Sequence, residues 1–299
     1  MSAKISDVAA AAGVSTSTVS RAFSAPDMVE AVTLARVLRV AAECGYVPNR
    51  AARGLITGRT GNIGLLLPDI ANPFFPSILK AIERRAMEAD YQIFLADTDE
   101  KKDVELGFVK SLAKQVDGMI LCSPRMDPVQ IREAASSLPI VLVNRRSGLL
   151  PSITVDNESG LRMVVDHLAD LGHAHLGYVA GPRSSWSSQV RRRSLRSASE
   201  LRETELVELG HFEPMFDGGR RSCAKVLQSG ITAVIAYNDL MAMGLCYELR
   251  ESGREVPADL SVVGIDDIPM ASMMHPALTT LSIPRRRRDA RRSSSSSSS

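Results

Sequence analysis

Residues 5–21 read ISDVAAAAGVSTSTVSR, and this stretch predicts two short helices joined by a tight turn. The first helix is predicted from apolar residues at helical spacing, namely Ile5, Val8, Ala9 and Ala12. Gly13 accepts the left-handed backbone with which many helices end. Ser15 has the hydroxyl that caps the start of a helix, so the second helix is expected to begin there.

The second helix presents a polar face whose chemistry suits DNA. Its buried side is predicted to hold Val19 and Ala22. The other side carries short hydroxyl groups and one guanidinium, on Thr16, Ser17, Ser20 and Arg21. Such groups fit base edges and phosphates in a major groove. A small helical hairpin with a solvated polar face is the alternative reading of the same pattern.

A third amphipathic helix is predicted from Leu34, Val37, Leu38 and Ala41. Residues 45–55 then read GYVPNRAARGL. This run, together with AGVSTSTVSR before it, closely resembles the LacI family of bacterial transcription regulators, because two motifs occur in the right order and at the right distance. The resemblance implies a helix-turn-helix headpiece in which the second helix enters the major groove. Its DNA-binding residues would then be Ser15, Thr16, Ser17, Ser20 and Arg21.

The segment NRAARGL matches the hinge helix of that family. Asn49 would cap this helix, Arg50 and Arg53 would supply charge for phosphates, and Leu55 would be the wedge that enters the minor groove. By itself the segment could equally be a linker. The headpiece also departs from the family pattern, because Glu30 replaces the usual Ser or Thr cap of the third helix. A lost cap costs about 1 kcal/mol, partly offset by the favourable position of a carboxylate at a helix start.

Composition places the chain among cytoplasmic proteins with more than one domain. It has 299 residues, of which 44% are hydrophobic, and its four cysteines form no CxxC pair. We therefore expect reduced thiols, no disulfide, no metal site and no cofactor. No apolar run approaches the roughly 18 residues of a membrane span, and the N-terminus lacks the apolar region of a signal peptide.

The charge of the chain is unevenly distributed. The formal net charge is +2, yet residues 285–299, RRRRDARRSSSSSSS, carry six arginines and one aspartate. The rest of the chain is therefore net acidic. Residues 1–60 are an exception, because their lysine and arginines outnumber their acidic residues. This local excess can supply the part of DNA affinity that does not depend on sequence.

From Ile63 onward, apolar strands alternate with amphipathic helices, and the rhythm restarts after Pro151. This pattern predicts two parallel-sheet α/β subdomains with a cleft between them. The family resemblance extends over this region and implies a core that looks like the periplasmic sugar-binding proteins. The expected domains are a headpiece with hinge helix over 1–58, an α/β core over 61–284 and a disordered tail over 285–299. Within the core we expect subdomains over 61–156 and 157–278, with 279–284 returning to the first.

Polar residues follow several of the predicted strands, where open α/β sheets bind ligands. They include Asn72, Asn144, Asn238 and Asp266. The family resemblance nominates Phe74 and Asn72 from DIANPFF, Arg191 from GPRSSWSSQVR, Asn238 from YNDLMAMG and Asp266 from VVGIDD. Arg191 can donate a bidentate hydrogen bond, and Trp186 could stack on a sugar face. These residues predict a small polar effector, most simply a carbohydrate.

An enzyme is the competing class of function. The chain has no GxxxxGK[ST], GxGxxG, GxSxG or HExxH motif, and neighbouring residues such as Asp266 and Asp267 usually point in different directions. We therefore expect no catalysis. The predicted function is a repressor that binds a pseudo-palindromic operator in double-stranded DNA as a homodimer, with affinity controlled by the effector. The alternative is a cytosolic small-molecule-binding protein whose regulation is impaired by a truncated C-terminus.

The C-terminal sequence departs from the family. The resemblance implies a further helix and strand after Pro284 that complete the first subdomain, but Arg-rich and Ser-rich sequence follows instead. A truncated or frameshifted reading would explain this. Without those elements, we expect an apolar face to be left on the first subdomain.

Overall fold

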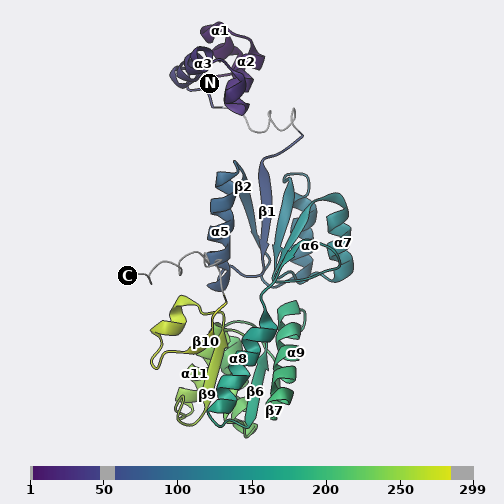
Figure 1. Cartoon of the computed structure of the whole chain (residues 1–299), viewed down its shortest axis with the longest axis vertical. Helices are drawn as coiled ribbons and strands as arrows, with labels where there is room; N and C mark the ends of the chain where they lie inside the picture. The colour runs from purple at the N-terminus through teal and green to yellow at the C-terminus, as the bar shows by residue number, and fades with distance from the viewer. Residues whose placement is uncertain (1–2, 48–57, 284–299) are drawn as a thin grey trace, which may run out of the picture. The chain divides into compact units, whose positions relative to one another are not determined.

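The computed structural model describes residues 3–47 and 58–283. The chain divides between Gly61 and Asn62 into two compact units (Figure 1). The predicted hinge-helix residues Asn49, Arg50, Arg53 and Leu55 lie outside the described residues, as does the tail over 285–299. Their roles remain predictions.

The first unit is helical, as its sequence predicts. Its elements are α1 (Ile5–Ala12), α2 (Thr16–Ser24), the 3₁₀ turn η1 (Pro26–Met28) and α3 (Ala31–Glu43). Gly13 ends α1 with a φ of 64°, in the left-handed region. The Ser15 hydroxyl accepts a hydrogen bond from the Thr18 amide at 3.1 Å, which confirms the predicted cap of α2. Glu30 makes no such side-chain bond to α3.

A small apolar core fixes the rotation of these helices. Val8, Val19 and Val37 are fully buried in it, one from each helix. The prediction that Leu38 belongs to this core is wrong, because its side chain is 42% exposed and Val40 is buried instead. The polar face of α2 therefore points away from a well-packed interior.

The second unit contains two parallel sheets, which confirms the predicted α/β architecture. The first sheet has the order β2-β1-β3-β4-β5. Its strands are β1 (Asn62–Leu67), β2 (Gln92–Asp97), β3 (Gly118–Cys122), β4 (Ile140–Val143) and β5 (Ser152–Ile153). Its helices are α5 (Phe74–Glu88), α6 (Lys102–Leu112) and α7 (Pro128–Ser137).

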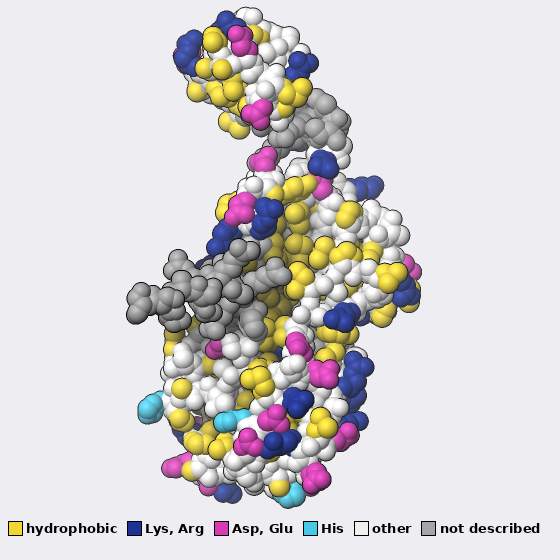
Figure 2. Space-filling view, viewed as in Figure 1, with side chains coloured by type: hydrophobic (Ala, Val, Ile, Leu, Met, Phe, Trp, Pro, Cys, Tyr) yellow, Lys and Arg dark blue, Asp and Glu magenta, His cyan; other side chains and the backbone are white. Residues whose placement is uncertain are grey.

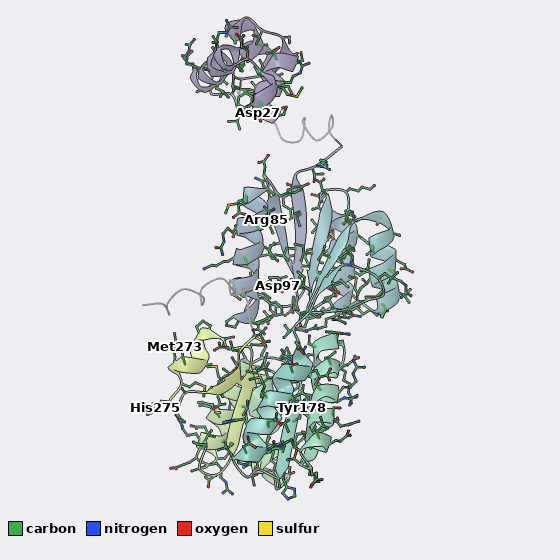
Figure 3. The ribbon with its side chains drawn as sticks, viewed as in Figure 1. Asp27, Arg85, Asp97, Tyr178, Met273 and His275 are labelled. Carbon is green, nitrogen blue, oxygen red and sulfur yellow. The ribbon has the colours of Figure 1, made fainter. Side chains whose placement is uncertain are left out.

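The second sheet has the order β10-β9-β8-β6-β7. Its strands are β6 (His175–Ala180), β7 (Glu205–His211), β8 (Ala233–Ala236), β9 (Ser261–Ile265) and β10 (Thr279–Leu281). Its helices are α8 (Asn157–Asp170), α9 (Trp186–Leu201), α10 (Phe216–Gln228), α11 (Asp239–Glu251) and the 3₁₀ turn η2 (Pro269–Met273). Tyr178 of β6 is fully buried within this subdomain (Figure 3).

One predicted boundary is wrong. The chain was expected to leave the second subdomain after residue 278, but Thr279–Leu281 pair in parallel with β9. These three residues therefore belong to the second sheet. The sequence signal was weak there, because a three-residue strand at a sheet edge has no periodicity to read.

The two subdomains share buried apolar side chains. Phe74 and Phe75 of α5 belong to the same buried cluster as Leu195 of α9 and Ile235 of β8. Helix α5 therefore starts beside the carboxyl ends of the strands in the second sheet.

An apolar groove is lined by residues of both subdomains. Its volume is about 1290 Å³, and it extends from α5 and the first sheet to α8 and β10. Residues that line it include Ile63, Ile82, Ile120, Val143, Met163 and Leu281. Figure 2 shows hydrophobic side chains gathered in a hollow of the first subdomain. Arg85 of α5, labelled in Figure 3, lines the groove.

Glycines allow α10 and α11 to approach closely. A Cβ at Gly244 would lie 1.9 Å from the carbonyl oxygen of Phe216, and one at Gly219 would lie 2.0 Å from that of Met241. Both obstacles are backbone atoms, so they cannot move aside without shifting a helix.

We expect Gly244→Ala to lower the free energy of unfolding by about 1–3 kcal/mol, because it overpacks this contact. Gly107→Ala is the matched control in α6, since nothing lies within 4 Å of its new Cβ. This control should raise stability by about 0.5–1 kcal/mol through helix propensity. Urea denaturation of both variants checks the prediction, and equal midpoints would contradict it.

Candidate functional site

The first candidate site is the exposed face of α2. Ser15, Thr16, Ser17, Ser20 and Arg21 are all exposed. Ser15 Oγ also lies 2.7 Å from Ser17 Oγ and caps the helix, so it orients the start of α2. The buried Val19 and Ala22 hold the opposite face in the core. A rigid helix thus presents hydroxyls and one guanidinium to solvent.

The second candidate site lies where strands of both sheets end. Four residues at these ends adopt left-handed backbone conformations that side chains disfavour. The φ angles are 46° at Ser123, 58° at Asn144, 122° at Asp266 and 54° at Asp267. They follow β3, β4 and β9. Such conformations cost free energy and persist only where the surrounding structure holds them in place. They are concentrated at functional sites in proteins.

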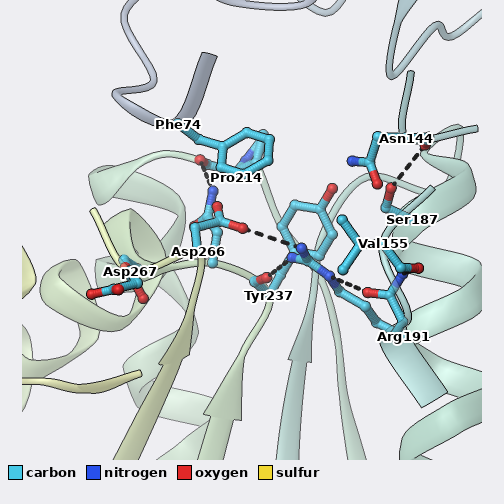
Figure 4. Close-up of polar contacts among 12 residues, drawn as sticks. Phe74, Asn144, Val155, Ser187, Arg191, Pro214, Tyr237, Asp266 and Asp267 are labelled. Carbon is cyan, nitrogen blue, oxygen red and sulfur yellow. Dashed lines mark hydrogen bonds and ion pairs between the residues drawn. The ribbon is translucent and has the colours of Figure 1, made fainter. Parts of the chain in front are cut away.

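Arg191 of α9 is the centre of this second site. It is 3% exposed, and each of its three guanidinium nitrogens donates a hydrogen bond (Figure 4). Nη2 lies 3.2 Å from Asp266 Oδ1, Nε lies 3.3 Å from Asn157 Oδ1, and Nη1 donates to the carbonyl of Tyr237. Burial lowers the pKa of Arg191, but the carboxylate of Asp266 is the main influence that raises it, and the net shift is upward. The guanidinium therefore stays charged.

Residues after β8 complete this wall of the site. Asn238 donates from Nδ2 to the Pro214 carbonyl at 2.7 Å and accepts from the Met241 amide at 2.9 Å, so it caps α11. Asp239 is fully buried and accepts from the Ile268 amide at 2.9 Å and from Thr280 Oγ1 at 2.5 Å. These bonds tie the start of α11 to the ends of β9 and β10.

The first subdomain supplies the opposite wall. Phe74 is 5% exposed and packs edge-on against Phe75, with ring centroids 5.2 Å apart. Asn144 donates from Nδ2 to Ser123 Oγ at 2.9 Å, while its buried Oδ1 has no hydrogen-bond partner among the residues described. Ser187 of α9 donates to the Asn144 carbonyl at 3.3 Å, which joins the two subdomains (Figure 4).

The structure brings some of the nominated effector-binding residues into contact and leaves others apart. It brings Arg191 and Asp266 into direct contact, and α9 also reaches Asn144 through Ser187. Asn72 instead accepts at Oδ1 from the amide of Phe74, the first residue of α5, at 3.0 Å. Trp186 is half-buried as the first residue of α9.

Three residues of the site were missed from the sequence. Asn157 and Tyr237 both contact Arg191, and Arg125 lies after β3. Arg125 forms a bidentate pair with Glu100, at 2.5 and 2.8 Å. Burial lowers the pKa of Arg125, but the nearby Glu100 and Tyr237 outweigh this and raise it. Asn157 is the first residue of α8, and Tyr237 directly follows β8. Their positions at the ends of predicted elements could have marked them as candidate site residues.

Comparison with known proteins identifies the chain. Residues 4–49 match the model of the bacterial regulatory proteins, lacI family, and residues 165–287 match a periplasmic binding protein-like domain. The chain is 32% identical to the HTH-type transcriptional repressor CytR of Escherichia coli K12, over 95% of this chain and 85% of that protein. It is also 32% identical to the catabolite control protein A of Priestia megaterium, over 95% and 88%.

The chain belongs to the LacI family of transcription regulators. A crystal structure of the lac repressor dimer bound to operator and the anti-inducer ONPF matches it with a TM-score of 0.83 at 30% identity, over 94% of this chain and 87% of that one. No helix in the described ranges is long and apolar enough to cross a membrane. The same ranges contain no cluster of three or more metal-ligating side chains.

We expect Asp266→Ala to lower the free energy of unfolding by about 3–5 kcal/mol, because it leaves the buried guanidinium of Arg191 without its carboxylate. Asp267→Ala is the matched control, since Asp267 is exposed and should contribute no more than about 1 kcal/mol. Thermal or urea unfolding measures both. A loss of similar size in the two variants would mean that the ion pair is not the stabilising contact.

Glu105 of α6 provides a test of pH dependence. It is 2% exposed, and its Oε2 accepts from the amides of Arg125 and Met126 at 2.7 and 2.9 Å. Burial raises its pKa above the ordinary 4.5, although the two amides lower it. The folded state thus holds the proton more tightly than the unfolded state, and stability should fall as pH rises from 4.5 to the raised pKa. Glu105→Gln should lack this decline, and denaturation curves from acid to neutral pH would reveal a difference.

Proposed function

We propose that this protein is a repressor that binds a pseudo-palindromic operator as a homodimer. The exposed face of α2 carries the proposal, because a buried core orients its hydroxyls and Arg21 outward on a rigid helix. A single headpiece reads only a short half-site, and two-fold symmetry doubles the sequence that is read. The lac repressor dimer was crystallised with its operator, which supports the same arrangement here. The hinge residues Asn49, Arg50, Arg53 and Leu55 would add contacts to phosphates and the minor groove.

The site between the subdomains would bind the effector, a small polar molecule of the carbohydrate class. Arg191, Asp266, Asn238, Asn144, Asn72, Phe74 and Trp186 are the proposed effector-binding residues. Binding there would change how the subdomains meet and thereby change operator affinity. By thermodynamic linkage, operator must change effector affinity by the same factor. We expect no catalytic turnover and a cytoplasmic location.

Arg21→Ala tests the DNA assignment. We expect it to weaken binding to a selected operator by about 1–3 kcal/mol, since a guanidinium at a base edge is a specific contact. Arg39→Ala removes the same charge from α3, where Arg39 is exposed and paired with Glu43 at 2.8 Å. Electrophoretic mobility shifts and footprinting compare the variants at one salt concentration. The assignment fails if both variants keep wild-type affinity and sequence preference.

A further inference from the structure

The faces of the two parallel sheets are covered by different numbers of helices. In the second sheet, α8 and α9 pack on one face, and α10 and α11 pack on the other. In the first sheet, α6 and α7 pack on one face, where Val109 and Ile131 share a buried cluster with Leu121. Among the described residues, α5 is the only helix of the first subdomain on the other face, and it lies against β2. A parallel sheet is normally covered on both faces, so one helix position is open beside α5.

The open face of the first sheet forms the floor of the apolar groove. Its side chains are Ile63 of β1, Ile120 of β3, Val143 of β4 and Ile153 of β5. Ile153 is 68% exposed, whereas Leu121 and Leu142, on the covered face of the same sheet, are fully buried. A contiguous apolar surface of this kind marks an interaction site (Figure 2).

Helices form the walls of the groove. From α5, the lining residues recur at spacings of three and four and include Ser77, Ile78, Ala81, Ile82 and Arg85. From α8, Gly160, Met163, Val164 and His167 line the groove with the same spacing. Such rows form the ridges that pack into the grooves of a neighbouring helix. The small side chains of Ser77 and Ala81 leave room for that helix to come close.

The groove extends well beyond the effector site. Ile63 is the second residue of β1, whereas the proposed effector residues Phe74 and Asn144 lie where strands end. Helix α5, which forms the long wall, has 15 residues. At ~1.5 Å per residue, its length is about 22 Å, and a helix of similar length fits beside it.

The residues that follow Ile283 do not match this lining. They read PRRRRDARRSSSSSSS, and Pro284 and Ala290 carry their only apolar side chains. Burying guanidinium groups against apolar side chains without partners is strongly unfavourable. The occupant must instead have an apolar stripe at helical spacing and polar residues on its other side. A helix of another protein meets this requirement.

We propose that this groove docks one amphipathic helix of a partner protein, about 15 residues long, with its aliphatic stripe against Ile120 and Val143. The docked helix completes the layer that α5 begins. Helix-in-groove recognition uses apolar anchors at i, i+3, i+4 and i+7. The interaction is additional to operator and effector binding, because the floor of the groove contains none of the residues proposed for either.

The test measures binding of synthetic peptides to the full chain by fluorescence anisotropy. The first probe is a fluorescein-labelled 15-residue peptide with leucines at helical spacing and with glutamate and lysine elsewhere. The second has the same composition, with its leucines moved to alternate positions so that a helix has no apolar stripe. The first peptide should bind about tenfold more tightly or better, because only its helix can bury all its leucines in the groove.

Met163→Glu should weaken binding of the first peptide by about tenfold or more, because it places a charge in the apolar lining. Met163 is 66% exposed on α8, so this substitution leaves the fold intact. Leu201→Glu is the matched control, since Leu201 is 71% exposed at the end of α9 and does not line the groove. Thermal unfolding verifies that both variants are folded.

Equal affinity for the two peptides would overturn the proposal, as would unchanged affinity in Met163→Glu or an equal loss in Leu201→Glu. Two further results would also overturn it. Self-association that Met163→Glu abolishes and the peptide cannot displace would assign the groove to a second copy. Tighter peptide binding by a chain stopped at Pro284 would assign it to residues 285–299. Operator binding is measured separately with Arg21→Ala, so failure of the docking site is distinguishable from failure of the repressor assignment.

Discussion

The buried ion pair between Arg191 and Asp266 is the contact on which the effector site depends. Two charges removed from water lose much hydration, and attraction compensates only where geometry is good and the other polar groups are also bonded. Arg191 meets that condition, because Asn157 and the Tyr237 carbonyl accept from its other nitrogens. These bonds bring α8, α9, β8 and β9 to one point. The left-handed backbone at Asp266 is part of the same arrangement, since it turns the chain where the carboxylate must face α9.

The headpiece depends on a simpler constraint. Its core is made of small side chains, with Val19 and Ala22 of α2 packed against α1 and α3. Small residues allow close approach, and close approach fixes which face of α2 is exposed. The Ser15 cap then sets where α2 begins. DNA recognition of the kind proposed requires both, because a helix free to rotate would present no constant set of hydroxyls.

Much of the fold could be predicted from the sequence, because each element carried a local signal. Gly13 and Ser15 mark the turn between two helices, and apolar strands with intervening helices mark the parallel sheets. Leu38 was misplaced because Val37, Leu38 and Val40 are all apolar and the sequence does not show which of them face the core. In the structure Val37 and Val40 are buried and Leu38 is exposed. The strand at Thr279–Leu281 was misassigned because its pairing with β9 is a tertiary contact, which the local sequence does not reveal.

The candidate site could be predicted only in part, for a related reason. Strand ends nominate polar residues one at a time, and Asp266 was found in this way, whereas Arg191 was nominated by the family resemblance of GPRSSWSSQVR. Their pairing across 75 positions of sequence depends on the order of strands in the second sheet. Tyr237 was missed because the sequence around it reads as the end of a buried strand. Its ring is held beside Arg191 by contacts with Gly181 and Ser185, which are distant from Tyr237 in the sequence.

The way the subdomains meet limits how an effector could act. Ser187 bonds to the Asn144 carbonyl, and Phe74 shares a buried cluster with Leu195 and Ile235. Separating the subdomains would expose that cluster, so the contact has its own free energy before any ligand binds. A ligand can shift this equilibrium only by as much as its affinities for the two arrangements differ. A molecule that touched one wall alone would bind both arrangements equally and regulate nothing. Regulation therefore requires contacts on both walls, with Arg191 and Asp266 on one side and Asn144 or Phe74 on the other.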